Sequence, residues 1–364
     1  MSPEEKKRRF DRIREFMERE RLDSLLIHGR EGFNSRGNIR YVTGYGINIG
    51  EQFCIFPLHS EPVFFGSKNA NYHVQKIGWI THCVEAVEPQ EQIIDYLQEL
   101  SRGNSIGVPN LMNLPLSVYL SLERHFGGRV KDVTELFRAL RIVKSEEEVE
   151  KIRTAASVAD KVYNVLRRLL KPGVSDYEIY GEIKREIHRM GCEYSMDFID
   201  VQGNTVNLSN PRGNLTRADT VVAVETTPSF EGYYAQLAMA LPVLEFPKKL
   251  RHVFSVWQKA IQAGETLLVP GTRISDIYEK VTSTISGYGY TCPLRLGHAI
   301  GLDVIDFFSI SKDEGTKLVP GMVLAFHPCV MKETMEGIGM GYTYVIRDDG
   351  FERLNKVDLC MVSG

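Results

Sequence analysis

The chain has 364 residues, 43% of them hydrophobic and 25% charged, with a net charge of −3. These values are typical of a globular protein of about two domains, and they exclude the basic face of a nucleic-acid binder. No apolar run reaches membrane-helix length, none follows the charged N-terminus as a secretory signal would, and the six cysteines form no C-x-x-C pair. We therefore expect a cytoplasmic protein with reduced thiols that binds neither membrane nor nucleic acid.

The first third of the sequence alternates short apolar runs with helical patterns. Strands are predicted at residues 24–28, 53–56, 62–65 and 105–108, and helices at 90–100 and 116–125. This alternation predicts an α/β domain with a mostly parallel sheet.

The pattern then becomes almost wholly helical as far as residue 190. We place a domain boundary here and expect domains of residues 1–130 and 131–364. Ser145, followed three residues later by Glu148, predicts a capping box at the start of a helix.

The second half of the sequence contains an internal repeat. Segments 171–176 and 269–276 each hold a Pro-Gly turn before a helix start, and the apolar run 219–225 matches 321–327, offset by 102 residues (321 − 219). Two matches in the same order indicate a duplication. Glu225 and His327, which end the matched runs, are then expected to face each other near a pseudo-twofold axis, where clefts often hold sites.

Four motifs resemble the creatinase/aminopeptidase P family: LRIVKSEEE at 140–148, NIRYVTGY at 38–45, GHAIGLD at 297–303 and VPGMVL at 319–324. They are spread over the whole chain. The resemblance implies an N-terminal α/β domain followed by an α+β, pseudo-twofold "pita-bread" domain. It also implies a homodimer in which the first domain lies near the partner's active site.

Metal-dependent members of this family hold two divalent ions with two aspartates, one histidine and two glutamates. The resemblance places these five positions at Glu225, Gln236, His298, His327 and Gly341. Two neighbouring cations need bridging carboxylates to offset their repulsion, and Gln236 and Gly341 supply none. The resemblance therefore implies that the dinuclear centre is lost, and we expect no metal and no other cofactor.

Creatinase is a metal-free member of the family, and segments 226–234 and 328–331 resemble it. This predicts metal-independent hydrolysis of a C–N bond in a small polar amino-acid-like, amide or guanidino compound. His298 and His327 would transfer protons, and Glu225 would bind a cationic group or orient an imidazole. The proton-transferring histidine of creatinase aligns near Ser209 or Asn210, where this chain has none, so the substrate is not expected to be creatine.

Two alternatives remain open. His298, His327 and Glu225 resemble the two-histidine, one-carboxylate set of mononuclear metal sites, which supports oxidative or lyase chemistry. The chain is alternatively a non-catalytic binding protein, although the replacement of polar residues by other polar residues favours retained chemistry. The candidate substrate contacts are Gln236, Ser209, Asn210, Tyr234, Tyr342, Arg40 and Tyr41.

Overall fold

The computed structural model describes residues 1–34, 36–46, 50–100, 103–203, 205–332 and 337–359. The chain forms two compact units, Met1–Arg141 and Ile142–Gly364. The division lies further along than residue 130, because β6 (Val130–Asp132) pairs with β5 (Ser105–Val108) and so completes the first sheet. Of the helices in the described ranges, none combines the length and apolarity of a membrane span.

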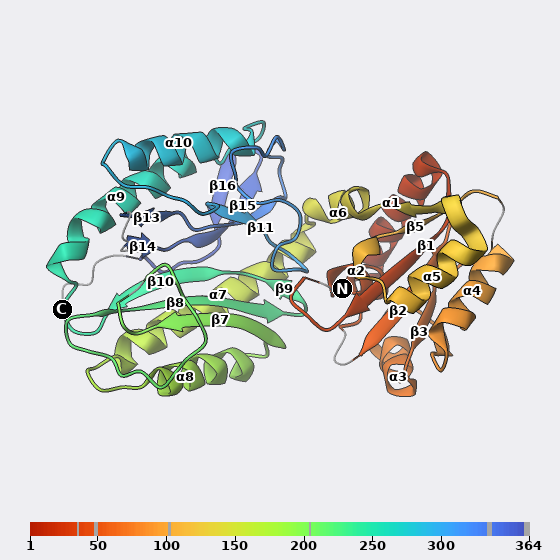
Figure 1. The fold of residues 1–364 in the computed structure, drawn as a ribbon, viewed down its shortest axis with the longest axis horizontal. Coiled ribbons are helices and arrows are strands. Elements are labelled where there is room, and N and C mark those ends of the chain that lie inside the picture. The colour runs from red at the N-terminus through yellow and green to blue at the C-terminus, as the bar shows by residue number, and fades with distance from the viewer. Residues whose placement is uncertain (35, 47–49, 101–102, 204, 333–336, 360–364) are drawn as a thin grey trace. The chain divides into compact units, whose positions relative to one another are not determined.

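Unit 1 is built on a six-stranded mixed sheet in the order β4-β3-β2-β1-β5-β6 (Figure 1). Its first four strands are β1 (Leu22–Arg30), β2 (Glu51–Pro57), β3 (Val63–Gly66) and β4 (His82–Glu85). The pairs β3–β4, β1–β5 and β5–β6 are parallel, whereas β1–β2 and β2–β3 are antiparallel. The predicted α/β class is confirmed for this unit.

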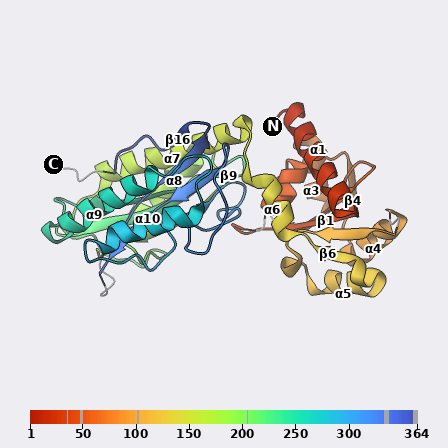
Figure 2. The ribbon, with the colours of Figure 1, turned by 90° about the horizontal axis from the view of Figure 1, so that it is seen from above.

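Helices cover both faces of this sheet, with α1 and α5 on opposite sides (Figure 2). The helices are α1 (Pro3–Glu20), α2 (Gly37–Thr43), α3 (Lys68–Ile77), α4 (Pro89–Leu100), α5 (Leu116–Phe126) and α6 (Thr134–Ile142), with short 3-10 turns η1 (Leu111–Asn113) and η2 (Gly127–Arg129). On one face, Phe10 of α1 packs edge-on against Phe56 at 5.0 Å. On the other, apolar side chains of α4 and α5 bury those of β1, β2, β3 and β5.

Unit 2 has two pairs of helices, α7 (Glu146–Leu169) with α8 (Asp176–Arg189), and α9 (Lys248–Glu265) with α10 (Ile274–Ser286). The predicted capping box is confirmed at Ser145 of α7, and a second one forms at Ser175 of α8. Helices α8 and α10 each begin four residues after the proline of the repeated turn, since 176 − 172 and 274 − 270 are equal. The duplication predicted from the sequence is thus present in the helices.

The strands of unit 2 repeat the same relationship. One sheet has the order β10-β8-β7, with β9 also on β8, another has the order β11-β12-β15-β16, and β13 pairs with β14. The bounds are β7 (Tyr194–Asp200), β8 (Val221–Phe230), β9 (Tyr233–Tyr234), β10 (Leu237–Pro242), β11 (Gly297–Ala299), β12 (Val323–Phe326), β13 (Cys329–Met331), β14 (Gly337–Gly339), β15 (Tyr342–Arg347) and β16 (Gly350–Arg353). Ala238 and Gly341 exchange backbone hydrogen bonds of 3.1 and 3.0 Å, which joins the two larger sheets.

This junction places the matched runs at equivalent distances from it, because β8 pairs with β10 on one side and β12 pairs with β15 on the other. Strands β8 and β12 begin at equivalent residues of the repeat, and α8 lies on the opposite side of the strands from α9 and α10 (Figure 1). The α+β, pseudo-twofold class predicted for the second domain is confirmed. The candidate site lies at the centre of this second domain.

Candidate active site

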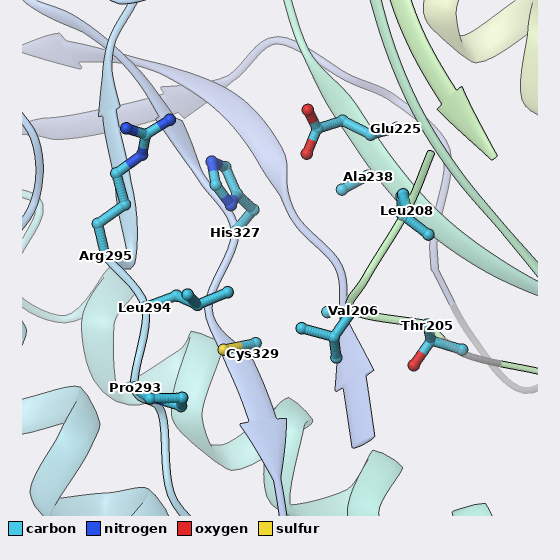
Figure 3. Close-up of a pocket in the computed structure, with 11 residues that line it drawn as sticks. Thr205, Val206, Leu208, Glu225, Ala238, Pro293, Leu294, Arg295, His327 and Cys329 are labelled. Carbon is cyan, nitrogen blue, oxygen red and sulfur yellow. The ribbon is translucent and has the colours of Figure 1, made fainter. Parts of the chain in front are cut away.

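A pocket of about 520 Å³ lies at the junction of the two halves of unit 2. Figure 3 shows Arg295, His327 and Glu225 along one side of the pocket and the apolar side chains of Leu294, Pro293 and Val206 along another. The full lining consists of Thr205, Val206, Leu208, Glu225, Ala238, Pro293, Leu294, Arg295, His327, Cys329 and Gly339. The pocket therefore offers one cationic group, one acidic group and an apolar wall.

Glu225 lies inside β8, which continues to Phe230, so it does not end the strand. It is opposite Ala238 of β10 and Phe198 of β7. Burial raises the pKa of its carboxyl to about 6, although the positive charge of Arg295 and the nearby amide of Gln236 act in the opposite direction. The buried carboxylate is thus poised to exchange a proton slightly below neutral pH.

The two histidines are held as neutral rings. His327 follows β12, and burial, then the charge of Arg295, lowers its pKa to about 4. His298 is at the centre of β11, and burial, then His327, lowers its pKa to about 3. The rings meet edge to face, with centroids 5.4 Å apart.

The ring nitrogens of the two histidines have different surroundings. His298 Nδ1 lies 3.1 Å from the carbonyl of Ala299, which can only accept, so Nδ1 is the donor. His327 Nε2 has no hydrogen-bond partner within the described part of the chain. His327 is therefore available to a ligand, whereas His298 is outside the pocket lining and supports the His327 ring.

Gln236 is the second unpartnered polar group at the site. The residue is 2% exposed, and its amide makes no hydrogen bond of good geometry with a described residue, although it lies close enough to Glu225 to lower the pKa of that carboxyl. Its backbone N–H donates to the Thr343 hydroxyl at 2.8 Å, which fixes its position. Leaving a buried polar group without a partner costs on the order of 1–3 kcal/mol, which is typical of sites that bind ligands.

Gly341 has no space for any side chain. A Cβ atom there would lie 2.0 Å from the Phe326 carbonyl oxygen and 2.6 Å from His327 Cβ. The main chain before Pro328 and the His327 side chain therefore occupy the volume that a side chain at residue 341 would need. Tyr342, one of the expected substrate contacts, accepts a hydrogen bond from Leu359 N–H and is not part of the pocket lining.

Comparison with known proteins assigns this chain to a family. Residues 150–348 match the metallopeptidase family M24, and residues 9–143 match the creatinase/prolidase N-terminal domain. The chain belongs to metallopeptidase family M24. An uncharacterized peptidase of Staphylococcus epidermidis is 24% identical over 332 residues, which are 88% of this chain and 93% of that protein.

Solved structures of a prolidase and of an Xaa-Pro dipeptidase share the fold along nearly the whole chain. The prolidase of Pyrococcus horikoshii superposes with a TM-score of 0.85 at 18% identity, covering 98% of this chain and 100% of that one. The Xaa-Pro dipeptidase of Bacillus anthracis also gives 0.85, at 17% identity, with 98% and 99% covered. The family resemblance stated from the sequence is confirmed.

These comparisons correct the function predicted from the sequence. The prediction of metal-independent hydrolysis of a non-peptide C–N bond is wrong, because the family is one of metallopeptidases and the matched proteins are named as peptidases. The creatinase-like segments do not distinguish the two activities, since creatinases and prolidases share this scaffold. The names of the matched proteins do not test the alternative of a non-catalytic binding protein, which stays a prediction.

The residues of this M24 protein do not fit the metal centre that the family implies. At the five positions where the resemblance places metal ligands, the chain offers one carboxylate, two imidazoles, one amide and the side-chain-free Gly341. No group of three or more histidine, cysteine, aspartate or glutamate side chains that could hold an ion is found within the described ranges. The mononuclear alternative, which needs Glu225, His298 and His327 around one ion, gains no support from the described ranges.

The other predicted contacts are dispersed in this M24 protein. Ser209 and Asn210 line a separate polar pocket with Asp176 and Arg212. Tyr234 is 1% exposed and lies in β9. None of these three side chains lines the pocket that holds Glu225.

Arg40 and Tyr41 lie on α2 of unit 1. Tyr41 is fully buried, its hydroxyl donates to the Leu140 carbonyl at 3.3 Å, and the Arg9 guanidinium lies 4.5 Å from its ring centroid. These contacts are those of a packing residue. Arg40 is half-buried on the same helix.

Sequence reasoning missed Arg295 and a pair of cysteines. Arg295 is exposed, lines the pocket, and makes no ion pair with any described residue. Its only sequence signal is its position three residues before His298. Cys292 and Cys329 lie 3.1 Å apart, although 37 residues (329 − 292) separate them. Five of the six cysteines are free thiols, and Cys360 lies outside the described residues.

Proposed function

We propose that the chain hydrolyses the peptide bond of short peptides whose free carboxylate binds Arg295. The observation that carries this is the presence of one unpaired cation, Arg295, and one acid, Glu225, in a single pocket of about 520 Å³. That volume suits a dipeptide-sized ligand. Membership of the M24 family and the prolidase and Xaa-Pro dipeptidase names of its structural neighbours support a peptide substrate.

Arg295 would bind the substrate carboxylate through the forked N–H groups of its guanidinium. The apolar wall of Leu294, Pro293 and Val206 would then contact the side chain next to that carboxylate. The rigid ring of a proline would fit such a wall with little loss of conformational entropy. We therefore expect Xaa-Pro dipeptides to be the preferred substrates.

Glu225 would act as the acid and base of the reaction. Ionised at pH 7, its carboxylate would take a proton from a water molecule as the water oxygen bonds to the peptide carbon. The same proton would pass to the nitrogen as the C–N bond breaks. The unpartnered N–H groups of Gln236, which lies beside Glu225, would stabilise the negative oxygen, and His327 Nε2 would bind a substrate N–H.

The test is a panel of Xaa-Pro and Xaa-Ala dipeptides, with release of the free amino acids followed by chromatography. We expect Arg295→Gln to raise KM by about 10- to 100-fold with little change in kcat, because an ion-paired hydrogen bond is worth roughly 1.5–3 kcal/mol. Arg251→Gln, which removes an exposed arginine of α9, is the matched control and should behave as the unmodified protein does.

Peptides with an amidated C-terminus should bind the unmodified protein and Arg295→Gln equally weakly, because the group that Arg295 binds is gone. Glu225→Gln should lower kcat, and it should leave the difference in KM between free and amidated peptides unchanged. The proposal is wrong if no dipeptide is cleaved, or if amidation leaves KM unchanged.

A further inference from the structure

Cys292 and Cys329 meet where two segments of unit 2 are held together by their backbones. Thr291 and Met331 exchange both backbone hydrogen bonds, each 2.9 Å long. Cys292 follows Thr291 by one residue, and Cys329 precedes Met331 by two residues. The sulfur atoms of the two cysteines are 3.1 Å apart. The approach of the thiols is therefore fixed by the main chain and does not depend on one side-chain rotamer alone.

The pair is shielded from bulk solvent but adjoins the pocket. Cys292 is 8% exposed and Cys329 is 4% exposed, and Cys329 is part of the pocket lining. Figure 3 shows the Cys329 sulfur directed toward the segment that carries Pro293 and Leu294. A small oxidant that enters the pocket would reach the pair, whereas a large disulfide reagent would be hindered.

We propose that Cys292 and Cys329 form a redox-active dithiol site in the wall of the pocket, and that hydroperoxides convert it reversibly to an intramolecular disulfide. Two neighbouring thiols, one poised to attack and one to resolve, are the arrangement found in redox-sensing cysteines. No such site follows from the peptidase fold or from the proposed function, and its detection does not depend on the substrate.

The reaction balances with hydrogen peroxide as the two-electron oxidant. One thiolate attacks the O–O bond, so that an S–O bond forms and hydroxide leaves, taking up the thiol proton as water. The second thiol then attacks the sulfenic sulfur, an S–S bond forms, and the oxygen leaves as a second water molecule. A hydrogen bond with Cys329 lowers the pKa of the Cys292 thiol, which favours Cys292 as the first nucleophile.

The disulfide would have a direct effect on the pocket. Leu294 and Arg295 follow Cys292 by two and three residues, and both line the pocket. Oxidation would tie the segment that carries them to β13. We therefore expect oxidation to change the affinity for an anion such as acetate or a dipeptide analogue, as a second readout beside the thiol count.

The experiment treats the fully reduced protein with a slight excess of hydrogen peroxide and then blocks the remaining thiols in denaturant. We expect two thiols per chain to be lost, the intact mass before blocking to fall by two hydrogen atoms, and a non-reducing peptide map to join Cys292 to Cys329. Dithiothreitol should restore both thiols.

Two variants and one control identify the reacting pair. Cys329→Ser should give no intramolecular disulfide and should leave a sulfenic acid on Cys292 that dimedone traps. Cys292→Ser should also give no disulfide. Cys192→Ser, which removes a buried thiol elsewhere in unit 2, should retain the link. If a variant does not fold, the peptide map of the unmodified protein is sufficient to decide the test. Retention of all thiols, a disulfide between other cysteines, or thiol loss by higher oxidation without a disulfide overturns the proposal.

Discussion

At the scale of single residues, the main chain around residue 341 leaves no space for a side chain there. Gly341 is enclosed by the Phe326 carbonyl and by His327, so that even a methyl group would require the backbone to move. Glu225, Gln236, His298 and His327 are buried polar groups near the centre of unit 2. The chemistry of the pocket follows from this small set together with Arg295.

We predict that Gly341→Ala lowers the free energy of unfolding by about 3 kcal/mol, because overpacking against backbone atoms is costly. Urea denaturation measures this directly. Gly315→Ala is the matched control, since a Cβ atom at residue 315 meets nothing within 4 Å, and it should change stability by less than about 0.5 kcal/mol. Equal stability of the two variants would contradict the packing described for Gly341.

The buried histidines predict a dependence of stability on pH. His298 and His327 have pKa values lowered to about 3 and about 4, so between pH 6.5 and pH 4 the unfolded state binds protons that the folded state does not. Stability is therefore lost as the pH falls. Glu225, with its pKa raised to about 6, acts in the opposite direction between pH 6 and pH 4.5. The two histidines outweigh the one carboxyl.

We expect the free energy of unfolding to fall by on the order of 2 kcal/mol between pH 7 and pH 5. In His298→Gln this loss should be smaller, because one of the two protons is no longer taken up on unfolding. His252→Gln, which replaces an exposed histidine of α9, should keep the loss seen in the unmodified protein. Identical pH profiles for the two variants would show that His298 does not contribute.

At the scale of elements, the sequence predicted what local patterns determine. The strand predicted at 105–108 matches β5, the other three lie within two residues of β1, β2 and β3, and the Ser145 capping box is present. The strands β4, β6, β9, β11, β13, β14 and β16 were missed, because strands of two to four residues depend on partners distant in the chain, and the longer strands β7, β10 and β15 were missed as well.

The same limit explains what was predicted of the site. Glu225 and His327 were paired by a repeat that can be read along the sequence. Arg295 and the contact between Cys292 and Cys329 could not be predicted in this way, since an exposed arginine and scattered cysteines have no periodic pattern. The function was misjudged because motifs identify a scaffold more readily than a reaction.

At two glycines within helices, we predict that substitution by alanine changes the stability of the protein in opposite directions. A Cβ atom at Gly181 of α8 meets nothing within 4 Å, so Gly181→Ala should stabilise the protein by about 0.5–1 kcal/mol through helix propensity. A Cβ atom at Gly264 of α9 would lie 2.4 Å from the Phe326 ring, so Gly264→Ala should destabilise it by about 1–3 kcal/mol. Urea midpoints that shift in the same direction would refute the argument.

At the scale of the whole molecule, the homodimer implied by the family resemblance stays a prediction, as does the cytoplasmic location. Sedimentation velocity at micromolar concentration should give a species of twice the 41.3 kDa chain mass. A sample that remains monomeric over the accessible concentration range would remove the expected role of residues 38–45 near a partner's pocket. It would not affect Arg295 or Glu225, which lie with the whole pocket lining inside unit 2.

The enclosure of Gly341 also determines the order in which an engineer would have to work to rebuild a dinuclear centre here. A glutamate at residue 341 is blocked first by the backbone at Phe326 and only then by the absence of other ligands. Exchanging His327 for glutamate and Gln236 for aspartate would supply carboxylates but would leave that carbonyl 2.0 Å from the new Cβ. The segment before Pro328 would therefore have to move before residue 341 could carry a ligand, so substitutions at His327 and Gln236 alone would leave that position without one.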